Sequence, residues 1–394
     1  MPDPKELPTM YNILTLNKIS ASGLSNFDNT KFACADNFDS PDAIIVRSAA
    51  MHEMEFQSNL LAVARAGAGV NNIPIDRCTE NGICVFNTPG ANANAVKELV
   101  ICSLFLASRK IVAGSKWCDT LKGNGDGVSK LVEKGKGNFV GPEILGKTLG
   151  VAGLGAIGIK VANAAKALGM NVIGYDPFIT DAAKAQLDET ITVTANLDDI
   201  FATADYITLH APLNDGTRGM IGKENLAKCK DGIRVLNFSR GELVDNADII
   251  EALANGKCAA YVTDFPTDEQ LGVDGVIAIP HLGASTPEAE ENCAVMAVCQ
   301  LSDYLLAGNV KNSVNFPAVT LEKTAKIRIT AVTLGDIASD IEKTLTDNGI
   351  AVAAKASGLR KTVGYAIFDT DTEITDEVIE ELKAVAGVTA LRII

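Results

Sequence analysis

The chain has 394 residues, a formal net charge of −14 and 47% hydrophobic residues. This length allows two or three domains, and the apolar content is typical of a globular protein with a buried core. The excess of acidic groups repels phosphate backbones, which argues against DNA or RNA as the main partner. The longest strongly apolar run, 99–108, is too short to cross a bilayer, so we expect no membrane association through a spanning helix.

The cysteines and the first residues predict a compartment. Nine cysteines are scattered without a C-x-x-C pair, which indicates neither a disulfide framework nor a zinc site. The chain begins MPDPKELP, without the apolar stretch of a secretory signal. We therefore expect small buried thiols, no metal and a cytoplasmic location.

Short apolar runs alternate with helical stretches along most of the chain, which predicts parallel α/β units. The segment 114–146 is rich in Gly and Lys and is expected to be a loop or a poorly ordered excursion, and 314–319 is expected to be a linker. The last segment follows the βαββαβ order of a ferredoxin-like fold. The predicted strands are 11–16, 43–46, 61–65, 84–87, 148–152, 171–175, 206–209, 234–238, 259–263, 276–279, 326–332, 351–356, 362–368 and 389–393, and the predicted helices include 92–111, 287–307, 337–348 and 376–384.

A glycine motif at the end of a predicted strand is the strongest local signal. Gly153, Gly155 and Gly158 form G-x-G-x-x-G between the strand 148–152 and a helix. The first glycine permits a tight turn, the second lets backbone approach a pyrophosphate, and the third lets helix and strand pack closely. Asp176 ends the next strand, where a carboxylate meets the ribose hydroxyls and repels a 2′-phosphate. The motif predicts NAD as cofactor rather than NADP.

Two further residues suit hydride-transfer chemistry on a hydroxy acid. The chain has three histidines, and His281 follows the strand 276–279, at a position where open α/β sheets bind ligands. An imidazole can remove a hydroxyl proton near neutral pH. Arg240 lies in NFSRGELVD, and its planar guanidinium can bind a carboxylate and polarise a carbonyl. His210 is expected to line the cofactor, and His52 to be an ordinary surface residue.

The motifs GLGAIG (153–158), HAPL (210–213), NFSRGELVD (237–245) and PHLGAST (280–286) resemble those of the D-isomer-specific 2-hydroxyacid dehydrogenases. The resemblance implies two α/β lobes separated by a cleft. A Rossmann-like NAD-binding lobe, 92–285, would be inserted in a flavodoxin-like substrate-binding lobe, 1–91 and 286–316. The segment 323–394 resembles an ACT domain, a regulatory and oligomerisation module with the ferredoxin-like order.

The same resemblance implies a catalytic triad of Arg240, Glu269 and His281. Many members carry Glu-Pro at the acid position, but this chain reads FPTDEQL, so Asp268 remains an alternative to Glu269. The acid would orient the ring and stabilise the imidazolium. The residues expected to bind the cofactor are Gly153, Gly155, Ala156, Ile157, Gly158, Asp176, His210, Ala211, Pro212, Phe238, Ser239, Arg240, Asp264, His281, Gly283 and Ala284.

Two arginines of the N-terminal lobe are candidates to bind a phosphorylated substrate, because a protein with a net charge of −14 needs local cations to hold a phosphate. Arg47 and Arg65 each follow an apolar strand of the N-terminal lobe, and the resemblance supports a role for them with a small 2-hydroxy acid such as 3-phosphoglycerate. A loop with backbone N–H groups for the substrate carboxylate would lie beside them. The expected substrate residues are Arg47, Ser48, Arg65, Gly67, Gly69 and Asn71.

The helix 92–111 is too apolar for a lone surface helix, and the resemblance implies a homodimer, or a homotetramer through the ACT-like segment. The stretch RITAVTLGDIA lacks the His, Asn and Pro of serine-inhibited relatives, which argues against serine feedback. Two other functions stay open. One is a dehydrogenase for an unphosphorylated acid such as glyoxylate or hydroxypyruvate, and the other is a non-enzymatic NAD-sensing protein.

Overall fold

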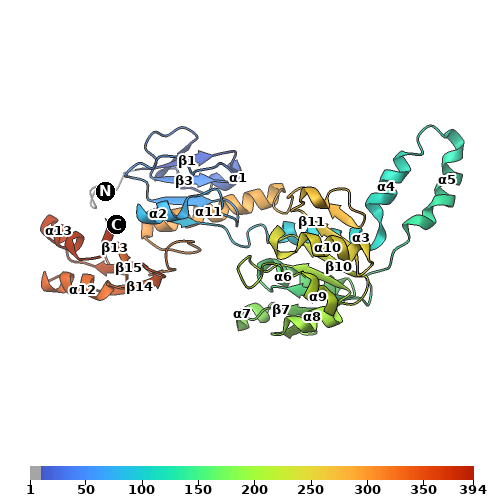
Figure 1. Cartoon of the computed structure of the whole chain (residues 1–394). Coiled ribbons are helices and arrows are strands. Elements are labelled where there is room, and N and C mark those ends of the chain that lie inside the picture. Colours follow the sequence, from blue (N-terminus) through green and yellow to red (C-terminus); the bar gives the residue numbers. More distant parts are fainter. Residues whose placement is uncertain (1–9) are drawn as a thin grey trace. The chain divides into compact units, whose positions relative to one another are not determined.

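The structure is a computed structural model in which residues 10–394 are described, so the prediction about a secretory signal lies outside the described residues. The chain forms two compact units, labelled by element in Figure 1. The first unit combines Met1–Asn92 with Pro287–Ile394, and the second is Ala93–Thr286. The first unit contains two sheets and the second unit contains one, and each unit has its own buried apolar clusters.

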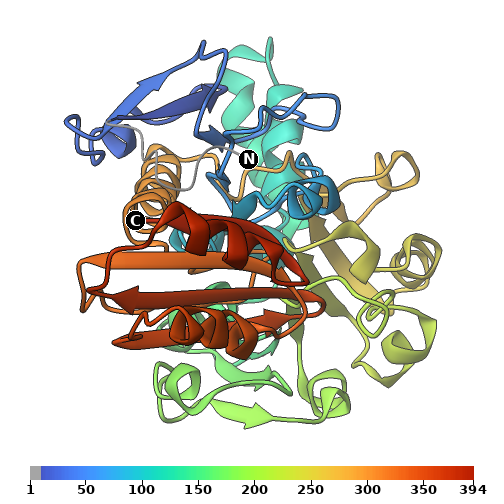
Figure 2. The same cartoon turned by 90° about the vertical axis from the view of Figure 1, so that its left-hand side faces the viewer.

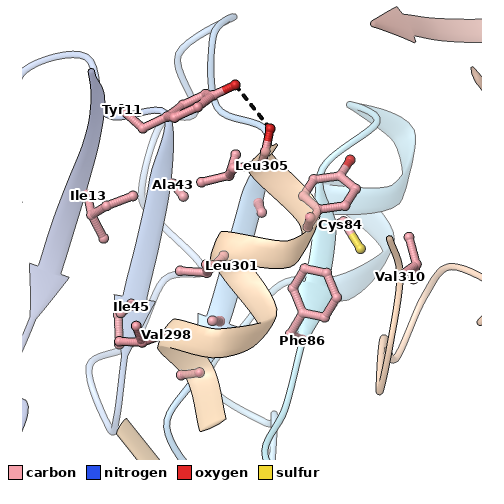
Figure 3. Close-up of a cluster of buried hydrophobic side chains, with 14 of the residues drawn as sticks. Tyr11, Ile13, Ala43, Ile45, Cys84, Phe86, Val298, Leu301, Leu305 and Val310 are labelled. Atoms are coloured by element: carbon pink, nitrogen blue, oxygen red, sulfur yellow. Dashed lines mark hydrogen bonds between the residues drawn. The ribbon is translucent and has the colours of Figure 1, made fainter. Parts of the chain in front are cut away.

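The first unit contains a five-stranded parallel sheet with the order β2-β1-β3-β4-β5, which is the flavodoxin-like order. Its central strands are buried on both faces, which explains their almost continuous apolar sequences. Figure 3 shows helix α11 packed against this sheet, with Leu301 among the buried residues and the Tyr11 hydroxyl donating to the Leu305 carbonyl at 3.1 Å. The elements are β1 (Tyr11–Leu16), α1 (Ala21–Leu24), β2 (Phe32–Ala35), β3 (Ala43–Val46), β4 (Ala62–Arg65), α2 (Ile75–Glu80), β5 (Cys84–Phe86) and α11 (Pro287–Ala307).

The C-terminal segment belongs to the first unit and forms a four-stranded antiparallel sheet with the order β14-β15-β13-β16 (Figure 2). Two helices cover one face of this sheet. The other face adds Val332, Tyr365 and Ile367 to the cluster that contains α11. The elements are β13 (Ile327–Leu334), α12 (Ala338–Asp347), β14 (Ala354–Arg360), β15 (Val363–Thr370), α13 (Asp376–Ala384) and β16 (Val388–Ile393).

Side chains from this antiparallel sheet bind the carbonyl groups at the end of α11. Arg392 donates to the Leu305 oxygen at 2.8 Å, Arg328 to the Ala307 oxygen at 2.7 Å, and the Tyr365 hydroxyl to the Gly308 oxygen at 2.7 Å. The last carbonyls of a helix have no partners within the helix, and cations are favourable near them. The C-terminal segment therefore caps α11, the helix that packs against the five-stranded sheet.

The second unit contains a seven-stranded parallel sheet with the order β12-β11-β10-β9-β6-β7-β8. If β6 is taken as the first strand, β7 to β11 fall in the order of a Rossmann sheet, and β12 adds one more strand at the edge. The predicted fold class is confirmed. The elements are α3 (Ala93–Arg109), α4 (Ile111–Asp119), α5 (Val128–Gly135), β6 (Thr148–Ala152), α6 (Ala156–Ala167), β7 (Asn171–Tyr175), α7 (Asp181–Lys184), β8 (Thr192–Thr194), α8 (Leu197–Thr203), β9 (Tyr206–Leu209), α9 (Lys223–Lys228), β10 (Ile233–Asn237), α10 (Asn246–Ala254), β11 (Cys258–Thr263) and β12 (Val276–Ala278), with short 3-10 turns between some of them.

The prediction of a loop over 114–146 was wrong. Helices α4 and α5 and two short 3-10 turns occupy most of this segment, and Figure 1 shows them apart from the sheet of their unit. The Trp117 and Phe139 rings pack at 5.3 Å, and a Cβ on Gly135 would lie 2.3 Å from the Trp117 ring. Gly135 permits this close packing, although from composition alone a glycine indicates a loop. Among residues 10–394, no helix is both long and apolar enough to cross a membrane.

Candidate active site

The three motif glycines have different surroundings at the turn from β6 to α6. Gly153 has φ +101°, and a Cβ there would lie 2.7 Å from the His210 carbonyl carbon. A Cβ on Gly158 would lie 2.0 Å from the Gly153 oxygen, so helix and turn could not approach as they do. A Cβ on Gly155 would meet nothing within 4 Å. Packing therefore requires the first and third glycines, whereas the second borders open space in which a pyrophosphate fits.

Asp176 lies directly beside this turn. Its Oδ2 accepts a hydrogen bond from the Leu154 amide at 2.9 Å, and its Oδ1 accepts one from the Phe178 amide at 2.9 Å. Helix α6 begins after Gly155, which offers no side chain to cap the first amides of the helix. An uncapped helix N-terminus next to a carboxylate matches the pyrophosphate and ribose ends of a dinucleotide. The residues of the turn therefore fit NAD.

His210 directly follows β9, and its ring is poorly suited to proton transfer near neutral pH. Its Nε2 lies 3.0 Å from the Thr208 hydroxyl oxygen, and burial lowers the pKa of the ring to about 4. The imidazole is therefore neutral near pH 7. The neighbouring Ala211 carbonyl accepts a hydrogen bond from the Ser239 hydroxyl at 2.8 Å, which joins the segments that follow β9 and β10. Ala211 and Ser239 belong to the predicted cofactor residues, and the structure brings them together.

Asp264 follows β11 and is the most unusual group of the second unit. The residue is 3% exposed, and neither carboxylate oxygen has a hydrogen-bond partner within residues 10–394. Burial raises the pKa of the carboxyl to about 7, while the charge of Arg240 acts to lower it. Buried polar groups normally have hydrogen-bond partners, so a buried carboxyl group without one suits a ligand that brings N–H donors. The carboxamide of a nicotinamide is such a ligand.

Arg240 and His281 lie on segments that border Asp264. Arg240 follows β10, and its Nη1 donates to the Ser239 carbonyl at 2.6 Å. The His281 ring is exposed and packs on the Phe265 ring, with centroids 4.6 Å apart. Two residues along the chain, a Cβ on Gly283 would lie 3.8 Å from Asp264 Oδ2. The segments after β10, β11 and β12 therefore gather three ionisable side chains at the carboxyl ends of adjacent strands.

The two candidates for the acid share one 3-10 turn, Asp268–Gln270. Glu269 accepts hydrogen bonds from the Thr267 hydroxyl at 3.0 Å and from the Asn246 amide at 3.5 Å. Thr267 and Gln270 also form a capping box that fixes the turn. The assignment of Glu269 rather than Asp268 stays a prediction, and both side chains are exposed.

The predicted substrate residues lie in the first unit, where β3 and β4 pair with Val46 opposite Arg65. Arg47 Nη1 lies 2.7 Å from Glu290 Oε1. The Arg65 guanidinium folds over Gly67, where a Cβ would lie 1.3 Å from its Nη1 and the backbone has φ +147°. Glu290 was not among the predicted site residues, although the run PEAEEN at the start of α11 is typical of acidic residues in the first turn of a helix.

The loop after Arg47 is held by a side chain from another segment: the backbone amides of Ser48 and Ala49 donate to Asn17 Oδ1 at 2.9 and 2.6 Å. The loop after Arg65 is held by its own backbone, because the Gly67 amide donates to the Arg65 carbonyl at 2.8 Å. The roles of Ser48, Gly67 and Gly69 with a substrate stay predictions.

The Asn71 carbonyl lies 2.9 Å from Nε2 of the exposed His52. This contact places His52 at the surface beside a predicted substrate residue.

Comparisons with known proteins show the family of this chain. Residues 102–283 match the family described as "D-isomer specific 2-hydroxyacid dehydrogenase, NAD binding domain". A D-3-phosphoglycerate dehydrogenase of Bacillus subtilis (strain 168) is 33% identical over an alignment of 369 residues, and the match covers 89% of this chain and 67% of that protein. A hydroxypyruvate reductase of Thermotoga maritima is 38% identical over 275 residues, 65% of this chain and 82% of that protein. The chain therefore belongs to the D-isomer-specific 2-hydroxyacid dehydrogenases, an NAD-dependent family.

Within the family, several similar curated proteins are D-3-phosphoglycerate dehydrogenases. One from Synechocystis is 38% identical over 73% of this chain and 51% of that protein. The chain spans about half to two thirds of the length of the first such relatives, from 51% to 67%. The solved structure titled "cofactor(NAD+) bound 3-phosphoglycerate dehydrogenase in Entamoeba histolytica" has a TM-score of 0.60 and 26% identity, and the match covers 78% of this chain and 99% of that one. The prediction of NAD as cofactor is confirmed.

Proposed function

We propose that this chain oxidises 3-phospho-D-glycerate to 3-phosphohydroxypyruvate with NAD, the first step of phosphorylated serine biosynthesis. The observation that carries the proposal is the pair Arg47 and Arg65 at the ends of the adjacent parallel strands β3 and β4. A chain with a net charge of −14 concentrates two guanidinium groups there, and bidentate guanidinium donors match phosphate oxygens. The names of the relatives support the same substrate.

The residues of the second unit divide the chemistry among them. Arg240 binds the substrate carboxylate and stabilises the oxygen that becomes a carbonyl. His281 accepts the proton of the substrate hydroxyl at a ring nitrogen, and a carboxylate, Glu269 or Asp268, orients the ring and stabilises the imidazolium. The glycine turn and Asp176 would hold NAD, which would supply the hydride acceptor for the carbon that bears the substrate hydroxyl. Asp264 would bind the carboxamide end of that cofactor.

The parts of the chain have separate roles in this proposal. Residues 1–91 and 286–316 bind the phosphorylated end of the substrate, and 92–285 bind NAD. Residues 323–394, with the βαββαβ order and an antiparallel sheet, act as an ACT-like regulatory and oligomerisation module. The expected assembly is a homodimer or a homotetramer, and the expected location is the cytoplasm.

The alternative is a reductase for hydroxypyruvate or glyoxylate, which the Thermotoga maritima relative favours by name. Such an enzyme shares Arg240, His281 and the NAD site but has no need for two phosphate-binding arginines.

NADH formation measured with 3-phospho-D-glycerate and with D-glycerate separates the two functions. We expect the phosphorylated acid to be preferred at least about tenfold in kcat/KM, and Arg47→Gln to remove most of that preference, because one charged hydrogen bond contributes about 1.5–3 kcal/mol. Lys31→Gln, which removes an exposed cation from the same unit, serves as the control. Equal kcat/KM values for both acids in the wild type would contradict the proposed substrate.

A further inference from the structure

Arg47, the predicted phosphate ligand, already has an anionic partner. Its Nη1 lies 2.7 Å from Oε1 of Glu290, and the two side chains are 33% and 38% exposed. Glu290 lies in the first turn of α11, a helix of 21 residues packed against the sheet that carries Arg47. If Arg47 binds a phosphate, the Glu290 carboxylate must either share the guanidinium with that phosphate or move away from it.

A buried thiol marks how close these charges are to one another. Cys293 lies on the same helix, 4% exposed. Burial raises the pKa of this thiol, Arg65 and Arg47 act to lower it, and Glu290 acts to raise it. The charges of Arg47, Arg65 and Glu290 therefore all act on this one thiol, in a protein whose net charge is −14. We call these three residues the arginine cluster, and the Arg47–Glu290 pair is its direct contact.

We propose that Glu290 is a specificity-determining residue that weakens and tunes phosphate binding by competing for Arg47. The proposal rests on the proposed function, since it assigns the phosphate of the substrate to the arginine cluster. Glu290 holds the Arg47 guanidinium in place when no substrate is bound, and it opposes the phosphate dianion when one is bound. Substrates without a phosphate do not meet this opposition.

Coulomb's law gives the expected effect of the Glu290 charge on phosphate binding. A phosphate ester carries about −1.5 to −2 charges near pH 7. A dianion held about 6 Å from a carboxylate in a water-like dielectric loses about tenfold in binding constant, and salt reduces this effect at exposed sites. Gln in place of Glu290 keeps an oxygen that accepts from Arg47 and removes only the charge. The two roles of Glu290 can therefore be separated by one substitution.

The test compares Glu290→Gln with wild type and with Glu288→Gln. Glu288 lies in the same first turn and is exposed, so its substitution removes the same charge from the helix N-terminus without touching the Arg47 pair. We expect Glu290→Gln to lower the KM for 3-phospho-D-glycerate and the inhibition constant of inorganic phosphate about five- to tenfold. The kcat/KM for D-glycerate should change less than about twofold, and Glu288→Gln should resemble wild type.

An unchanged or raised KM for the phosphorylated acid in Glu290→Gln would overturn the proposal and would make Glu290 a support for Arg47 only. Equal effects of the two substitutions would also overturn it. Titration calorimetry with inorganic phosphate keeps the inference separate from the proposed function. If the wild type does not oxidise 3-phospho-D-glycerate, tighter phosphate binding by Glu290→Gln still supports the competition, and phosphate binding by neither protein refutes it.

Discussion

Substitution of the second motif glycine separates cofactor binding from folding. At Gly155 the backbone has φ −76° and ψ −167°, which any residue adopts, and an added Cβ would meet nothing within 4 Å. Gly155→Ala changes only an N-cap residue, so we expect a loss of at most about 1 kcal/mol and a fall in Tm of about 2–4 °C. The methyl group would fill the space where a pyrophosphate approaches the backbone. NADH titration by fluorescence should give a Kd at least about tenfold higher, equivalent to 1.4 kcal/mol.

Gly158→Ala provides the contrast on the same turn. A Cβ there would lie 2.0 Å from the Gly153 oxygen, which is backbone and cannot move alone. This variant should lose stability by about 2 kcal/mol or more, at the upper range of overpacking costs, with a clear fall in Tm. If Gly155→Ala binds NADH within about threefold of wild type, the dinucleotide does not approach the turn at Gly155, and the assignment of the cofactor site is refuted.

Three other predictions concern charged groups. Asp176→Ala should weaken NADH binding and raise the relative affinity for NADPH, as measured by competitive titration, because the carboxylate that repels a 2′-phosphate is gone. Burial raises the pKa of the Asp264 carboxyl to about 7, whereas the pKa of an Asp in the unfolded chain is about 4. The stability that this group contributes is therefore present below about pH 4 and is lost as the pH rises through about 7. Asp264→Asn should flatten the dependence of the Tm of the cofactor-free protein on pH between these values. The Arg328 guanidinium contacts Asp369 at 2.7 and 2.9 Å, and both side chains are fully buried. Arg328→Met leaves the Asp369 carboxylate without this partner, so the free energy of unfolding measured in urea should fall by about 3–5 kcal/mol. An Asp264→Asn variant that keeps the wild-type slope, or an Arg328→Met variant as stable as wild type, would contradict the corresponding statement.

Most of the fold follows from local patterns in the sequence. Continuous apolar strands such as β3 and β9, separated by helices, predicted parallel sheets because they are buried on both faces. The two missed strands, β2 and β8, lie at sheet edges and are only four and three residues long. Short edge strands carry few buried residues, so their pattern is weak. The helices within 114–146 were missed because Gly135 permits close packing on Trp117, a contact that composition does not reveal.

The candidate site was predictable where its chemistry is local in sequence. The glycine turn and Asp176 share one strand-helix-strand unit, so spacing alone brings them together. The pKa of Asp264 was not predictable, because it depends on burial by segments that are distant in the chain. The same holds for Glu290, which meets Arg47 only because α11 returns to the N-terminal sheet. Neighbours brought together by folding, rather than the residue itself, decide such properties.

In the proposed reaction, His281 and Arg240 act on one carbon of the substrate, beside the position that the dinucleotide would occupy. The most direct test is single-turnover NADH formation by His281→Ala with saturating NAD and 3-phospho-D-glycerate, together with an NADH titration of the same variant. We expect the wild-type Kd for NADH and a rate about 100 to 10,000 times lower, the usual loss when a general base is removed. A rate close to that of the wild type would contradict the assignment of His281 as the base.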